Sequence, residues 1–166
     1  MFILCLHKDF KSQPKQTPLG GIMQQSIDKL NVLLSGYHVF YLNVRGYHWN
    51  VKGEHFFSLH TKFEELYTEL QNQIDEIAER ILTLGGTPLH AYSDYAALSN
   101  IQEHKNSFDG RECVSGVIKG LELLIAEQKA LIVIAEEAGD QNTADLLSNY
   151  TSGQEKHLWM YKAFLG

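Results

Sequence analysis

Apolar residues recur at alternating steps of three and four over four long stretches of this chain. The stretches span residues 24–48, 54–84, 110–138 and 142–163. This spacing places the apolar side chains on one face of an α-helix. No Val/Ile-rich alternating run suggests a competing strand. The sequence therefore predicts an all-α protein with four long amphipathic helices.

The connections between these helices predict how they are joined. Short breaks at 52–54 and 139–140 separate the first from the second helix and the third from the fourth. The longest connection, 85–109, begins with two glycines that end a helix well. Within it we expect a short extra helix at 93–98. One long crossover between the second and third helices is the connectivity of a ferritin-like four-helix bundle.

Length and composition place limits on the class of protein. A chain of 166 residues is long enough for one domain with a sizeable core. We expect a flexible tail at 1–22, which has prolines and glycines but no apolar period, and a bundle domain at 23–166. No apolar run approaches the roughly 20 residues of a membrane span. Cys5 and Cys113 lack disulfide or metal-site spacing, which fits the reducing cytoplasm.

Five side chains with metal-ligating chemistry lie in one part of the chain: His48, His60, Glu64, Asp75 and Glu79. The last four form two i,i+4 pairs on the second helix, so the members of a pair lie on one face, one turn apart. Imidazole and carboxylate groups together suit ferrous iron and similar divalent metals. Taken singly, His48 would be a core histidine and the acids would be surface residues. Their common register favours a metal site.

The face that carries these ligands lies beside the apolar stripe of the second helix and has no Lys or Arg. Acids without basic partners indicate an interface that a cation must neutralise. The centres of the two pairs are about 22 Å apart along the helix axis, at 1.5 Å per residue. One chain cannot close both pairs on one metal, but two chains packed antiparallel about a two-fold axis can. We therefore expect an intersubunit site and no tight metal binding by a monomer.

The same part of the chain resembles the Dps family, the DNA-protection-during-starvation proteins or mini-ferritins of the ferritin-like superfamily. The matching residues are His-Trp-Asn at 48–50, His60, an acid at 64, Asp75 and Glu79-Arg80. The segments LGGTPLH at 84–90 and HLWMYKAFLG at 157–166 also resemble this family. The likeness covers about residues 22–166, and its ligand pattern is specific.

The resemblance implies a hollow homo-dodecamer with iron sites at its two-fold interfaces. It implies a ferroxidase that oxidises Fe(II), preferably with hydrogen peroxide, and stores ferric mineral, which protects the cell from oxidative damage. Fe(II)/Fe(III) is then the expected metal, with Zn or another divalent ion as an alternative occupant. In this likeness, one subunit supplies His48, His60 and Glu64, and its neighbour supplies Asp75 and Glu79. Glu64 departs from the Asp of many members, which puts the occupancy of a second iron in doubt.

The resemblance also suggests roles for residues outside the ligand set. Trp49 matches a tryptophan beside the family's iron site and is a candidate electron donor, although packing is its simpler role. Three acids fall where the family has negative three-fold pores, which suggests iron entry: Glu136, Asp140 and Asp145. Asp140 and Asp145 lie at the start of the fourth helix, where an acid also serves as a cap.

Three alternatives compete with the ferroxidase. A nucleoid protein that compacts DNA is disfavoured by the net charge of −6 and by a weakly basic tail. A di-iron enzyme with its metal inside the bundle needs Glu-x-x-His motifs, and the chain has none. A purely structural oligomer is the third. The remaining histidines are expected to be structural or exposed: His38, His55, His90, His104 and His157. Four other large residues are expected to pack in the core: Tyr37, Tyr41, Trp159 and Met160.

Overall fold

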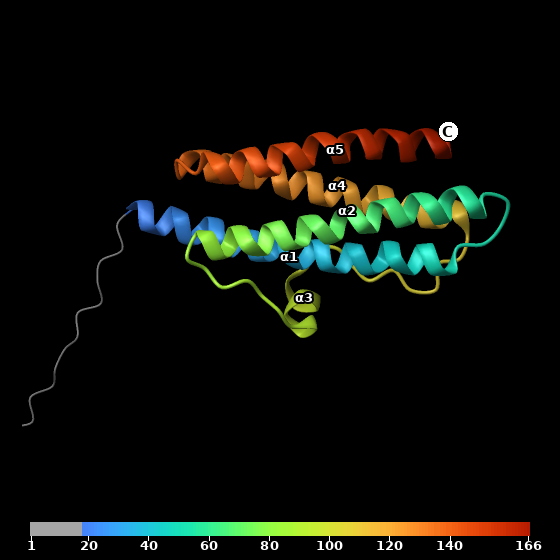
Figure 1. The fold of residues 1–166 in the computed structure, drawn as a ribbon, viewed down its shortest axis with the longest axis horizontal. Helices are drawn as coiled ribbons and strands as arrows, with labels where there is room; N and C mark the ends of the chain where they lie inside the picture. The colour runs from blue at the N-terminus through green and yellow to red at the C-terminus, as the bar shows by residue number, and fades with distance from the viewer. Residues whose placement is uncertain (1–17) are drawn as a thin grey trace, which may run out of the picture.

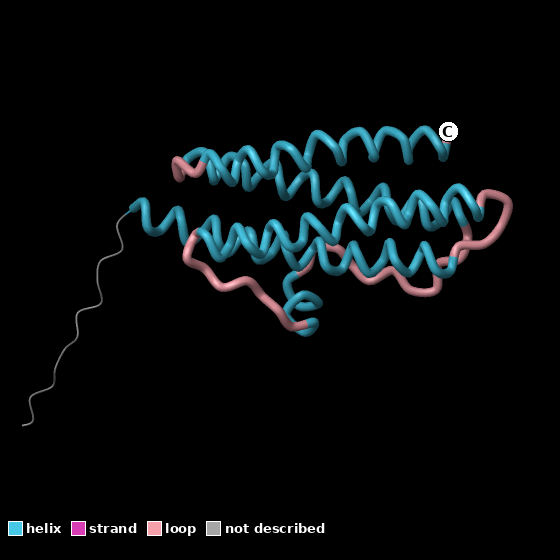
Figure 2. Tube along the Cα trace, in the orientation of Figure 1, coloured by secondary structure: helices cyan, strands magenta, loops and turns pink. Residues whose placement is uncertain are grey.

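A computed structural model describes residues 18–166, and this part of the chain forms five helices and no strand (Figures 1 and 2). The helices are α1 (Pro18–Asn50), α2 (Phe56–Thr83), α3 (Tyr92–Leu98), α4 (Gly110–Glu137) and α5 (Gln141–Leu165). The all-α class and the short helix in the long crossover are confirmed. Most of the predicted ends agree with the structure to within two or three residues.

The start of α1 differs from the sequence-based expectation. We expected a tail as far as residue 22, but the helix already begins at Pro18. Proline suits the first turn of a helix, because its missing N–H would have no partner there and its φ angle is already helical. The nearby Gly20-Gly21 pair lies inside this first part of the helix and does not break it. The rest of the expected tail, with Cys5, lies outside the described residues.

The four long helices form two antiparallel pairs. In Figure 1, α1 lies beside α2, and α4 lies beside α5. The long linker carries the chain back along the bundle, so α2 and α4 run in the same direction, and α3 packs against α1 (Figure 1). Gly85, with a φ of 81°, allows the sharp turn that ends α2 and starts this crossover. No helix within 18–166 is long and apolar enough to cross a membrane.

The centre of the bundle contains a polar layer within the apolar core. Gln154 of α5 donates to the Tyr37 hydroxyl of α1 at 2.7 Å and to Gln73 of α2 at 3.2 Å. Gln128 of α4 donates to Gln154 at 2.7 Å, so all four long helices meet there. Burial raises the pKa of Tyr37, which keeps the phenol neutral. The layer is made of neutral groups that bond mainly to one another.

Candidate metal centre

Two of the predicted ligands, His48 and His60, form a reciprocal pair across the turn between α1 and α2. Their rings stack with centroids 3.8 Å apart and planes 21° apart. The Nδ1 atom of His48 lies 2.8 Å from the His60 carbonyl oxygen, and the Nδ1 atom of His60 lies 2.8 Å from the His48 carbonyl oxygen. A carbonyl oxygen only accepts, so each Nδ1 carries the proton and donates it. Each Nε2 of the neutral imidazole therefore keeps a lone pair for a metal.

Neighbouring aromatic rings hold this pair in place. His48 is buried and meets the edge of Tyr67 at a centroid distance of 5.3 Å. His60 stacks on Phe56 at 5.1 Å. Rings held by packing and by outer hydrogen bonds are already oriented before a metal arrives. The resemblance to the Dps family implied that the two histidines belong to one ligand set, but the exchange of backbone bonds had no signal in the sequence.

The three predicted acidic ligands are exposed on α2 and have no hydrogen bond or ion pair to another described residue. They are Glu64, Asp75 and Glu79. The two cations of α2 are occupied elsewhere: Lys62 pairs with Glu65 at 2.5 Å, and Arg80 pairs with Asp140 at 2.6 Å. The acidic face is therefore uncompensated within one chain, as the lack of basic residues on that face predicted.

Large apolar side chains on α2 are exposed together with the acids. Phe57, near the start of the helix, is 84% exposed, and Leu82, near its end, is 58% exposed. Exposed apolar side chains gathered on one face are typical of an interaction surface. This face therefore has the composition of an interface. Its acidic charges would be neutralised there by cations that a single chain does not supply.

One chain does not bring the five predicted ligands together. Among the described residues, no group of three or more His, Cys, Asp or Glu side chains is placed to hold a metal ion. His60 and Glu64 lie one turn apart near the start of α2, while Asp75 and Glu79 lie one turn apart towards its end. The predicted ligands thus form two separate partial sets in each chain.

Trp49, the candidate electron donor, is not a core residue. Its side chain is 59% exposed, and the Arg45 guanidinium lies over its ring, 4.6 Å from the centroid. A cation above an indole face orients the ring without burying it. Packing in the core therefore does not explain this residue, and its redox role stays a prediction.

The three acids suggested for a pore differ in their surroundings. Asp140 is buried, caps α5 by accepting from the Thr143 N–H at 3.1 Å, and holds Arg80 of α2. This is the capping role that the sequence had left open. Glu136 is exposed, and Asp145 is exposed and accepts from Gln141 at 2.7 Å. A role in iron entry stays a prediction for all three.

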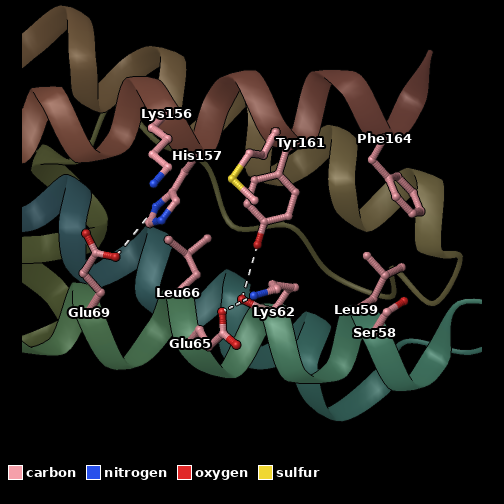
Figure 3. Close-up of a pocket in the computed structure, with 11 residues that line it drawn as sticks. Ser58, Leu59, Lys62, Glu65, Leu66, Glu69, Lys156, His157, Tyr161 and Phe164 are labelled. Atoms are coloured by element: carbon pink, nitrogen blue, oxygen red, sulfur yellow. Dashed lines mark hydrogen bonds and ion pairs between the residues drawn. The ribbon is translucent and has the colours of Figure 1, made fainter.

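A groove of about 430 Å³ lies between α2 and α5 and contains none of the five predicted ligands (Figure 3). Its walls include Leu66 and Tyr161, and the His157 ring faces the Glu69 carboxylate across it at 3.7 Å. Burial raises the pKa of Tyr161, and the nearby acids raise it further, so its hydroxyl stays neutral.

The expectation that Trp159 and Met160 pack in the core is wrong. Their side chains are 68% and 43% exposed. The two residues lie on a side of α5 that the other described helices of the same chain do not cover. Tyr37 is fully buried and Tyr41 is half-buried, in agreement with the prediction for these two residues.

Comparison with known proteins agrees with this architecture. Residues 27–166 match the family model of the ferritin-like domain. A Haemophilus influenzae protein of uncharacterised function is 52% identical over 136 residues, which cover 82% of this chain and 85% of that protein. A DNA protection during starvation protein from Porphyromonas gingivalis is 40% identical over 135 residues, covering 81% and 85% of the two chains.

Two solved structures are similar over nearly their whole length. The Dps protein of Vibrio cholerae O1, described as a member of a broad superfamily of ferritin-like diiron-carboxylate proteins, has a TM-score of 0.87 and 45% identity. The match covers 93% of this chain and all of that one. The Dps protein of Bacillus brevis has a TM-score of 0.86 and 40% identity, covering 88% and 98% of the two chains.

Proposed function

Since the chain belongs to the ferritin-like domain family and, within it, to the Dps proteins, we propose that it is a mini-ferritin with ferroxidase activity. It oxidises Fe(II), with hydrogen peroxide as the oxidant, at sites shared by two subunits. It stores the ferric product inside a hollow homo-dodecamer. The reciprocal pair of His48 and His60, with both Nε2 atoms free for a metal, is the observation that carries this proposal.

Each site takes ligands from two chains. His48, His60 and Glu64 come from one subunit, and Asp75 and Glu79 come from its neighbour. Two α2 helices that run antiparallel about a two-fold axis bring the partial sets together twice, so a dimer has two sites. The exposed acids and the exposed apolar side chains of α2 support this arrangement, because both become buried when the second chain and the cations arrive.

The ligand set suits the oxidation of iron. Hard carboxylate oxygens favour Fe(III) over Fe(II), so the site favours the loss of an electron. Two Fe(II) ions and two protons reduce one hydrogen peroxide to two water molecules, which avoids the release of hydroxyl radical. When only one iron is bound, the exposed Trp49 beside His48 is the proposed source of the second electron.

The first test is the rate of Fe(II) oxidation by peroxide, followed by the absorbance of the ferric product. We expect the fast phase of the wild type to be lost in His60→Ala/Asp75→Ala. The matched control is His90→Ala/Asp28→Ala, which removes the same two residue types from exposed positions. Oxidation by the wild type that is no faster than in buffer would remove the ferroxidase assignment.

A mixing experiment tests whether the site is shared between subunits. Subunits of His60→Ala and Asp75→Ala are inactive alone, but a mixed dimer has one intact site and one site that lacks both ligands. Random pairing should therefore restore about a quarter of the wild-type activity. Inactive single variants with no recovery after joint refolding would mean that both residues act within one chain. Single variants that keep full activity would mean that neither residue acts.

DNA binding stays the alternative function, and the acidic charge of the chain opposes it.

A further inference from the structure

His104, in the linker between α3 and α4, makes a short contact with a buried phenol. Its Nδ1 atom lies 2.6 Å from the hydroxyl oxygen of Tyr47, and the two rings meet edge to face at 5.5 Å. Gly116 of α4 makes room for this contact, because a Cβ atom there would overlap both the Tyr47 hydroxyl and the His104 ring. The contact fixes the orientation of the imidazole and directs its other nitrogen, Nε2, away from Tyr47.

The Nε2 atom of His104 faces the carboxylate of Glu112 at a distance too long for a good hydrogen bond. It is 3.5 Å from Nε2 to Oε1, which is longer than the 2.7–3.2 Å of a good N–H···O hydrogen bond. Two ligands of one tetrahedral zinc ion, with bonds of about 2.0–2.1 Å, lie about 3.4 Å apart. The separation therefore fits two ligands of a common metal better than a direct hydrogen bond.

From this geometry, we propose that His104 Nε2 and Glu112 Oε1 bind a divalent transition-metal ion of the Zn²⁺ class, at a site distinct from the iron-oxidising one. In this site Tyr47 accepts the Nδ1–H of His104 and takes the place of the carboxylate, carbonyl or water that usually orients a metal-bound histidine. With only two protein ligands the ion is exchangeable, and water completes its coordination.

The surrounding hollow gives the ion access to solvent. It has a volume of about 460 Å³, and the uncharged polar residues Gln102 and Ser115 are among those that line it. The adjacent acid, Glu103, also lines the hollow but pairs with Lys105 at 2.7 Å. Lys119, seven residues after Glu112 on α4, is the nearest lysine of that helix, about 10 Å away along the axis at 1.5 Å per residue. Arg111, next to Glu112, donates to the Leu165 carbonyl at 2.7 Å, so among the described residues only His104 is paired with the Glu112 carboxylate.

The backbone that carries the two ligands is held in place. The side chain of Asn43 on α1 accepts from the His104 N–H at 2.9 Å and donates to the Gln102 carbonyl at 2.9 Å. Glu112 lies in the first turn of α4, where its N–H is capped by Asp109 at 3.0 Å. A bound ion would connect the linker and α4 directly, and α1 through Tyr47.

The test is Zn²⁺ binding by the full, assembled chain in the background His60→Ala/Asp75→Ala, which removes the proposed iron site. We expect one equivalent of Zn²⁺ per chain, lost on adding His104→Ala or Glu112→Gln and retained on adding His90→Ala. Tetrahedral Co²⁺ should show its intense visible absorption in the background protein and not in the two ligand variants. Glu112 is exposed, so Glu112→Gln removes a ligand without a threat to folding.

Tyr47→Phe separates the outer partner from the ligands. It should keep the stoichiometry and weaken the affinity for Zn²⁺ by about 10- to 100-fold. An unchanged affinity would remove Tyr47 from the site. The site itself is disproved if the background protein binds no Zn²⁺, or if His104→Ala and Glu112→Gln leave the binding unchanged. Peroxide-dependent iron oxidation by His104→Ala in the otherwise wild-type chain should persist, which distinguishes this site from the proposed ferroxidase.

Discussion

The centre of the bundle and the outer face of α2 are both rich in polar groups, but the groups differ in charge and in hydrogen bonding. In the centre, neutral amides and a phenol bond to one another across four helices. On the outer face, Glu64, Asp75 and Glu79 have no partner among the described residues. Burying unpaired charge costs several kcal/mol, whereas hydrogen-bonded neutral groups are tolerated. The central groups find most of their partners within one chain, with the Oε1 atom of Gln128 as the exception. In the proposed function, the outer face finds its partners in a second chain and in cations.

Removal of the central glutamine should have the largest effect on folding. Gln154→Leu leaves the Tyr37 hydroxyl, Gln73 and Gln128 without their shared partner inside the core. Each unsatisfied buried group costs about 1–3 kcal/mol, so we expect a loss of about 3 kcal/mol or more. Urea unfolding of the metal-free protein would measure it. A loss below about 1 kcal/mol would mean that water replaces the amide and that the centre is not closed.

Neutralising the outer acids should affect activity rather than folding. Asp75→Asn/Glu79→Gln should slow peroxide-driven iron oxidation by at least about 10- to 100-fold, the loss already seen when only an outer partner of a ligand is removed. The unfolding free energy of the metal-free protein should change by no more than about 0.5 kcal/mol, as for ordinary surface substitutions. A large loss of stability with normal oxidation would mean that these acids stabilise the fold and do not take part in iron oxidation.

Glu127 of α4 differs from both groups, because it is a partly buried acid with a hydrogen-bond partner at only one of its two oxygens. Its replacement should have a smaller effect on stability. Its Oε1 accepts from Asn100 at 2.6 Å, while its Oε2 is buried without a partner. Burial raises the pKa of this carboxyl. An acid with a raised folded pKa contributes stability below its unfolded pKa and loses that contribution as the pH rises through the folded pKa.

The substitution Glu127→Gln should therefore stabilise the protein at pH 7, by about 0.5 kcal/mol given the partial exposure. This advantage should shrink as the pH falls towards the usual range of a glutamic acid, where the wild-type side chain is also neutral. Unfolding free energies at neutral and acidic pH would measure it. An advantage that grows on acidification would show that the wild-type carboxylate is stabilised, not destabilised, by its surroundings.

The fold was predictable from the sequence to the extent that it depends on local pattern. The apolar period of α2 and the glycines after it indicate both the helix and its end, because these signals act within a few residues. The start of α1 was missed, since the Gly20-Gly21 pair suggested a break while the structure continues the helix from Pro18.

The site was predictable in its residues but not in its geometry. The spacing of His60 and Glu64 gives a common face without further information. The stacking of His48 on His60 depends on how the turn at 51–55 brings two helix ends together, and a helical period says nothing about that. The exposure of Trp159 was missed for a similar reason. An amphipathic pattern indicates that apolar side chains pack against another surface, but it does not show whether that surface belongs to the same chain.

The exchange of backbone bonds between His48 and His60 has a consequence for genetics. Each ring donates a hydrogen bond to the main chain that carries the other ring, so the replacement of one histidine also affects the other. Replacing one removes a ligand and also leaves the main-chain carbonyl of the other without its hydrogen-bond donor. The two single substitutions should then each cost nearly as much as the double one, as coupled residues do. We therefore expect selection to keep or lose the two histidines together.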